Sequence, residues 1–266
     1  MAPDNANATP FARAMQMLAG LSDPLLTKPW EWPGHTGETL PVREALYRSL
    51  EEEQASAVSA PASAAEAARI LALASQAWGD LCGLLISTPD RLLHVQPAPG
   101  EWSLAETLAH LLLGERNYAE QTAYAAHRSD SEPLRKELHT DLSEEDRAGG
   151  TLAWIERLEA AHTRSYALAT LPDEALDRPT IWVGYQVTIR FRLHRFASHV
   201  AEHTIQAEKI LTTIAPPPTE AARIVRRIYQ TRGLHQHLSS PQALQTLDAI
   251  HLDLATTLAA RSQDRT

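Results

Sequence analysis

The stretch PAPGEWSLAETLAHLLLGERNY, residues 97–118, shows how this chain builds its helices. Its segment Ser103-Leu-Ala-Glu106 is a capping box, in which the serine and glutamate side chains satisfy backbone N–H groups at a helix start. Apolar residues then recur with the spacing of one helix face, which predicts a helix over 103–127. His110 lies two turns into that helix, among leucines.

Six further helices are predicted from similar signals. A second capping box, Ser63-Ala-Ala-Glu66, starts one of them, prolines 216–218 end another, and Gly233 ends a third. The predicted ranges are about 41–56, 63–87, 143–171, 189–214, 219–233 and from 241 onwards. The β-branched and aromatic segment 180–190 fits either a small hairpin or an extended lead-in to the helix at 189.

These ranges predict an all-α protein. The four long helices at 63–87, 103–127, 143–171 and 189–214 form an antiparallel four-helix bundle, which we expect to occupy residues 63–215. Residues 1–62 are predicted to be an N-terminal arm and helix packed on the bundle, held by Trp30 and Trp32 in a stretch too rich in Pro and Gly for helix. Residues 216–266 are predicted to be a C-terminal helical extension.

Composition argues against several classes of protein. The chain has 33 acidic and 24 basic residues and a formal charge of −9, so it is not expected to bind nucleic acid, although the local basic cluster Arg223, Arg226, Arg227 and Arg232 makes that a minor alternative. No apolar stretch approaches the ~18 residues that span a bilayer. No signal peptide is visible, so we expect a cytoplasmic protein with no membrane contact. The single cysteine, Cys82, lies in an apolar run and is expected in the core.

Two of the twelve histidines have the spacing of a metal site. His199 and His203 are four residues apart in RFRLHRFASHVAEHTIQAEKIL, residues 190–211, so both imidazoles project from one side of a helix. Both lean towards its apolar stripe, where an imidazole needs either a metal or hydrogen bonds to Glu, Asp or the backbone. His110 is a candidate third ligand, because bundles assemble metal sites from facing helices. Three imidazoles leave a coordination position open for water or substrate.

The remaining histidines have simpler interpretations. His235 and His237 are expected to be a solvated pair or a helix C-cap, and His251 is a single residue in the last helix. Isolated histidines next to loops or on polar helix faces are expected at the surface: His94, His127, His139 and His162.

Some charged and polar residues are candidates to assist the site. Arg192, Arg195 and Gln206 project near the His199 side. The two arginines are candidates to bind an anionic cosubstrate, or they form a solvated basic edge. Glu115 is a candidate to orient a metal ligand by a hydrogen bond to it, or it belongs to a helix surface.

The two quoted stretches resemble the DinB-like superfamily, which includes mycothiol-dependent maleylpyruvate isomerases and bacillithiol transferases. The matching features are the Gly-Glu-Trp-Ser helix start followed by His110, and the helix that carries His199 and His203. The similarity covers about residues 64–214. It implies a four-helix bundle, frequently dimeric, in which these three histidines hold a divalent metal. The N-terminal arm and the C-terminal tail lie outside the common bundle.

The resemblance implies a metal-dependent enzyme that activates a low-molecular-weight thiol for S-transfer to, or isomerisation of, a small-molecule substrate. One alternative is a metal-dependent hydrolase that activates water. Another is a non-enzymatic, metal-bearing stress or binding protein. Three histidines suit Zn²⁺, Ni²⁺, Cu²⁺ and Fe²⁺, so the sequence does not choose the metal. We expect a homodimer.

Overall fold

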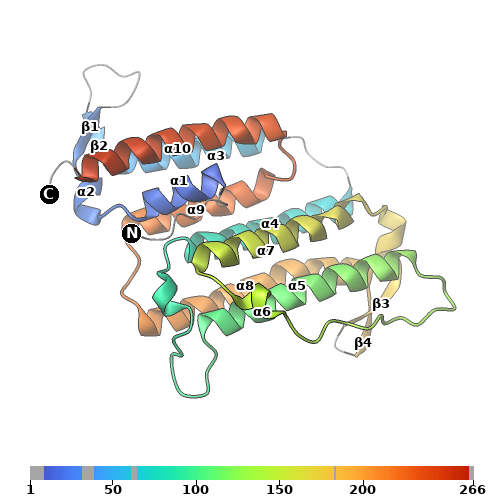
Figure 1. Cartoon of the computed structure of the whole chain (residues 1–266). Helices are drawn as coiled ribbons and strands as arrows, with labels where there is room; N and C mark the ends of the chain where they lie inside the picture. Colours follow the sequence, from blue (N-terminus) through green and yellow to red (C-terminus); the bar gives the residue numbers. More distant parts are fainter. Residues whose placement is uncertain (1–8, 32–38, 61–64, 183, 264–266) are drawn as a thin grey trace.

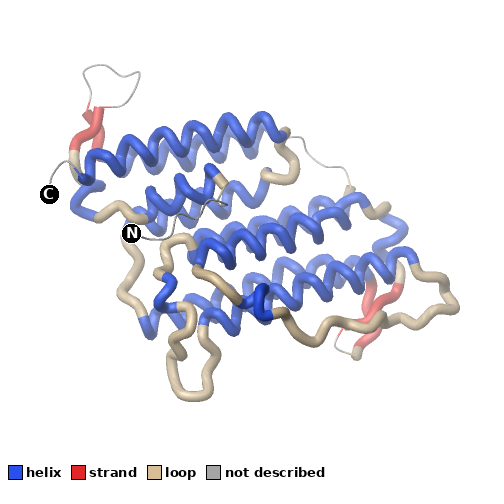
Figure 2. The backbone as a smooth tube through the Cα atoms, in the orientation of Figure 1, coloured by secondary structure: helices blue, strands red, loops and turns tan. Residues whose placement is uncertain are grey.

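The computed structural model describes residues 9–31, 39–60, 65–182 and 184–263. Within these ranges the chain is almost entirely helical, with two short hairpins (Figures 1 and 2), so the predicted all-α class is confirmed. The helices are α1 (Pro10–Ala19), α2 (Asp23–Leu26), α3 (Val42–Ser59), α4 (Glu66–Leu85), α5 (Leu104–His127), α6 (Glu144–Arg147), α7 (Thr151–Ser165), α8 (Ile189–Ile214), α9 (Glu220–His235) and α10 (Pro241–Gln263).

The four helices α4, α5, α7 and α8 form the bundle. Both α7 and α8 pack against α4 and against α5. Helix α8 runs antiparallel to α5, and α7 runs antiparallel to α4 (Figure 1). The long connection over 128–150 returns along the bundle, so α5 and α7 run in the same direction.

The third long helix, predicted over 143–171, is interrupted, so that prediction was wrong. The segment forms α6, then α7, then a 3-10 turn over Tyr166–Thr170. Gly149 has φ +92°, a left-handed conformation that a helix cannot pass through. The carboxylate of Asp90 then accepts hydrogen bonds from the backbone N–H and the hydroxyl of Thr151, both at 2.7 Å, and so anchors the start of α7.

Helix ends agree with the predictions at α5, at both ends of α8 and at the starts of α9 and α10, and differ at other ends. At α5, Ser103 and Glu106 form the predicted capping box. Helix α4 begins at Glu66, and Ser63 lies outside the described residues. Helix α9 continues through Gly233 to His235, so the predicted end at Gly233 was wrong. Helix α1 was not predicted, although Thr9 caps it and Pro10 occupies its first turn.

Two hairpins complete the fold. Strands β3 (Pro179–Trp182) and β4 (Tyr185–Thr188) pair antiparallel and lead directly into α8. Of the two alternatives predicted for the segment 180–190, the hairpin is therefore the one observed. In the arm, β1 (Pro29–Glu31) pairs with β2 (Thr39–Pro41). Trp30 is buried as predicted, while Trp32 lies outside the described residues.

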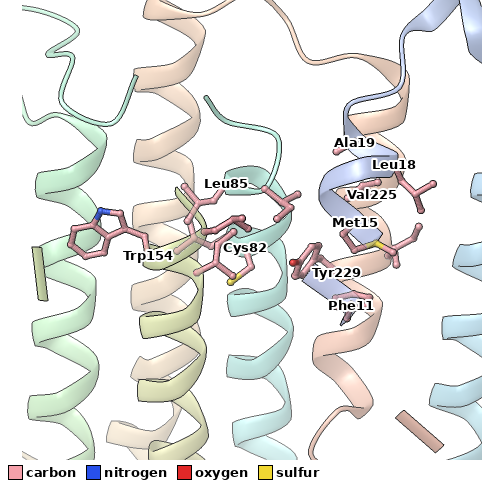
Figure 3. Packing of buried hydrophobic residues seen from close by; sticks show 14 of the residues in the cluster. Phe11, Met15, Leu18, Ala19, Cys82, Leu85, Trp154, Val225 and Tyr229 are labelled. Atoms are coloured by element: carbon pink, nitrogen blue, oxygen red, sulfur yellow. The ribbon is translucent and has the colours of Figure 1, made fainter. Parts of the chain in front are cut away.

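The N-terminal and C-terminal segments together build a second helical layer. Helices α1, α3, α9 and α10 pack on one another, and α9 covers α4 (Figure 1). Side chains of the two layers meet in one core, in which Phe11 and Tyr229 make an edge-to-face contact at 4.8 Å and Cys82 is buried (Figure 3). In the described part of the chain, no helix has an apolar stretch long enough to cross a membrane.

Candidate metal centre

The three histidines of the predicted site meet between α5 and α8. His110 comes from α5, and His199 and His203 come from successive turns of α8. The Nε2 atoms of His110 and His199 are 3.2 Å apart, and the candidate ligand atoms of all three residues lie within 4.8 Å of one another. His199 and His203 are 8% and 7% exposed, whereas His110 is exposed. The cluster therefore has a buried side on α8 and an accessible side on α5.

The protonation states of the rings suit metal ligation. The Nδ1 of His203 donates to Oε1 of Gln206 at 2.8 Å, which leaves its Nε2 lone pair free. Burial, together with the charges of His203 and His110, lowers the pKa of His199 to about 3. Burial also lowers the pKa of His110. His110 and His199 are thus neutral near pH 7, the form in which an imidazole binds a metal.

The spacing of the rings fits a single ion. A zinc ion about 2.1 Å from each imidazole nitrogen holds two such nitrogens about 3.4 Å apart in a tetrahedral site. The His110–His199 pair, at 3.2 Å, already has this separation. No Cys, Asp or Glu of the described residues joins the three histidines as a fourth ligand. The donor set therefore fits a divalent metal with an open coordination position.

Neighbouring side chains fix the position of His199. A Cβ atom at Gly114 would lie 2.7 Å from Cε1 of His199, so α5 makes room for the ring by having glycine there. On another side, Tyr118 lies against the ring with centroids 5.2 Å apart. The guanidinium of Arg192 covers Tyr118 in turn, 4.6 Å from its ring centroid. Gly114 and Tyr118 were not predicted as site residues, because their role depends on the contact between two helices.

A cleft of about 590 Å³ leads to the cluster. Its wall on α8 includes His203, Gln206 and Lys209, and its opposite wall is the loop that precedes α5, including Trp102. The ring of Trp102 is 43% exposed and packs against His110 with centroids 5.3 Å apart. A cleft of this volume is within the range of small-molecule sites.

The two candidate anion-binding arginines have partners within the protein. Arg192 is buried and donates to the carbonyl of Ile181 at 2.7 Å. Arg195 lies over Trp182, 5.0 Å from its ring centroid, and pairs with Glu202 at 3.5 Å. Arg192 is therefore not part of a solvated edge. Neither arginine lines the cleft, and their binding of an anionic cosubstrate stays a prediction.

Glu115 does not contact the three candidate ligands. It is 2% exposed and accepts from Nδ1 of His162 at 3.0 Å, while Nε2 of His162 is hydrogen-bonded to the hydroxyl of Ser75 at 2.7 Å. The surface interpretation of Glu115 was therefore wrong, and so was that of His162, which is 1% exposed. The backbone of Gly233 in α9 packs closely on the carbonyl of Ser75 in α4.

A second buried polar cluster joins α3, α9 and α10. Glu53 is fully buried and accepts hydrogen bonds from His235 at 2.7 Å, from His251 at 2.9 Å and from Arg232. His237 stacks on Tyr166 at 4.1 Å. His235 is buried and His237 is partly buried, so the alternative of a solvated pair was wrong, and His235 is the last residue of α9.

Part of the predicted basic cluster is also neutralised within the protein. Arg232 pairs with Glu53 and Asp248, and Arg226 pairs with Asp80 and Glu208. These two arginines are held by carboxylates of the same chain and do not form an open basic surface.

The conserved profile of the DinB superfamily matches residues 73–207, about half of the chain, including all three histidines of the cluster. The chain belongs to the DinB superfamily. Searches of curated proteins and of solved structures each found no match. Members of the DinB superfamily bind metals, which agrees with the cluster of His110, His199 and His203. Helices α1, α3, α9 and α10 lie outside the DinB match.

Proposed function

We propose that this DinB protein uses a divalent metal held by His110, His199 and His203 to activate a low-molecular-weight thiol for S-transfer or isomerisation. The observation that carries the proposal is the convergence of three imidazoles, one of which, His203, lines an open cleft, with no fourth protein ligand among the described residues. A structural metal site is normally closed by a fourth ligand, whereas a catalytic site keeps one position open.

A divalent metal in such a site lowers the pKa of a thiol, so that thiolate is available near neutral pH. Other residues of this chain hold the metal-ligating imidazoles in position. Gln206 fixes the tautomer of His203, and Gly114 with Tyr118 fixes the ring of His199. In S-transfer, the thiol releases its proton to solvent, its sulfur forms a bond to an electrophilic carbon, and the leaving group departs with the bonding electrons.

Metal analysis of untagged protein tests the site itself. We expect about one divalent ion per chain, lost in His199→Ala and in His203→Ala. His194→Ala is a matched control, because His194 is exposed on the same helix and is not in the cluster. Protein that binds no ion after incubation with Zn²⁺, Ni²⁺ or Fe²⁺ would overturn the proposal.

Activity assays on the metal-loaded protein test the reaction. Bacillithiol, mycothiol and glutathione are each supplied with a model electrophile, and we expect conjugation that depends on the metal and on His203. Turnover of ester or amide substrates without any thiol would replace the proposal with hydrolysis. Absence of both reactions in metal-loaded protein would favour a non-enzymatic, metal-bearing role.

A further inference from the structure

The α8 wall of the cleft presents hydrogen-bond donors beside the metal cluster. Oε1 of Gln206 already accepts from His203, so the amide nitrogen is the group that Gln206 has left for a ligand. Lys209 lines the same cleft, is exposed, and forms no ion pair with any described residue. An ammonium group has donors only. A ligand that follows this wall is therefore best matched by acceptor oxygens.

The position of Lys209 relative to the cluster is set by the helix. Gln206 follows His203 by three residues and Lys209 follows it by six, which are rises of about 4.5 and 9 Å along α8. The apolar part of the cleft lining comes mainly from Trp102, which is 43% exposed, and Ile210, which is 4% exposed. The helix fixes the separation of the Cα atoms of His203 and Lys209, whereas Glu101, which also lines the cleft, lies on a loop.

We propose that the cleft selects elongated ligands that carry a carboxylate or another anion at the end remote from the metal, with Lys209, about 9 Å beyond His203 in rise along α8, as the specificity-determining residue. The apolar part of the ligand lies between Trp102 and Ile210. This proposal rests on the proposed function, because it requires a ligand whose other end enters the open coordination position. It adds the charge and the length of that ligand.

The test uses Co²⁺-loaded full-length protein, in which binding of a thiol is followed by the near-ultraviolet sulfur-to-cobalt absorption. Two probes of equal length, 6-mercaptohexanoate and 6-mercaptohexanol, differ only in the charge at the far end, and thioglycolate carries the same charge on a short chain. We expect 6-mercaptohexanoate to bind about twofold to fivefold more tightly than 6-mercaptohexanol, as for one exposed ion pair. The preference should fall with added salt.

Variants assign the preference to Lys209. Lys209→Gln should abolish it without changing the affinity for 6-mercaptohexanol or the cobalt content, and Lys209→Arg should retain it. Lys136→Gln is the matched control, because Lys136 pairs with Glu120 outside the cleft. Glu101→Gln should keep the preference.

Three outcomes overturn the inference. Equal binding of the two long probes would remove the anion preference and leave thiol binding, and with it the proposed function, in place. If thioglycolate bound as tightly as 6-mercaptohexanoate, the predicted length of the ligand would be wrong. A cobalt spectrum that no thiol changes would overturn the proposed function together with the inference.

Discussion

Gly114 of α5 leaves the space that the imidazole of His199 on α8 occupies. Any Cβ at position 114 would approach Cε1 of that ring to 2.7 Å, closer than side-chain packing tolerates. The atom Cε1 lies next to Nε2, the nitrogen that faces His110 at 3.2 Å. The absence of a side chain at Gly114 therefore determines the position of the His199 imidazole, a candidate metal ligand.

Gly114→Ala should weaken metal binding by about tenfold to a hundredfold, the usual range for residues that orient ligands. It should not unfold the protein, because alanine favours a helix interior over glycine by about 1 kcal/mol. A competition titration with a metal chelator measures the affinity, and thermal unfolding of the metal-free protein measures the stability. Gly20→Ala is the control, since a Cβ there meets only ordinary contacts at 3.5 Å. Unchanged metal affinity in Gly114→Ala would contradict this role.

Gln206 should affect metal affinity through His203. Its Oε1 accepts a hydrogen bond from Nδ1 of His203 at 2.8 Å, so Nε2 is the ring nitrogen left to bind a metal. Gln206→Met removes that acceptor, and we expect an affinity loss of about tenfold. Gln206→Glu keeps an acceptor oxygen and should restore the affinity. The same chelator titration separates the two variants, and equal affinities would show that the hydrogen bond does not matter.

Acid should selectively remove the contribution of Glu53 to folding stability. Burial alone raises its pKa, but hydrogen bonds from His235 and His251 and the charge of Arg232 outweigh that effect and lower the pKa to about 2. A carboxyl group with a lowered pKa stabilises the fold fully above its unfolded value of about 4.3. The contribution is lost as the pH falls towards 2, and at neutral pH it amounts to about 3 kcal/mol.

Glu53→Gln should therefore lower the free energy of unfolding by about 3 kcal/mol at pH 7, with the difference from wild type shrinking between about pH 4.3 and 2. Urea unfolding of metal-free protein at several pH values measures this. Glu51→Gln, an exposed position on the same helix, should change stability by less than about 1 kcal/mol at every pH. A difference that stays constant down to pH 2 would refute the charged role of Glu53.

The sequence was most informative where a signal is local. His199 and His203 lie one turn apart on one helix, and their lean towards the apolar stripe follows from the helical period alone. The capping box at Ser103 likewise acts within four residues. His110 needed the resemblance to the family, since no pattern within α5 says that α8 faces it.

The misjudged residues depend on segments far away in the sequence. His162 is buried because Glu115 and Ser75, on two other helices, pair with its ring. His235 is buried against Glu53, 182 residues earlier in the chain. Gly233 was predicted to end a helix, as glycine often does, but here it serves a close helix contact. Such contacts exist only once the helices are packed.

Gly233→Ala should weaken the contact between the bundle and the second helical layer. A Cβ at this position would lie 2.3 Å from the carbonyl oxygen of Ser75, so α9 must move away from α4. We expect a loss of about 1–3 kcal/mol in the free energy of unfolding, as for other overpacked positions. Metal affinity should stay unchanged, because the histidine cluster lies between α5 and α8 and does not involve α9. Chelator titration and urea unfolding of Gly233→Ala and Gly114→Ala should thus give opposite patterns, and a loss of metal affinity in Gly233→Ala would mean that the second layer shapes the site.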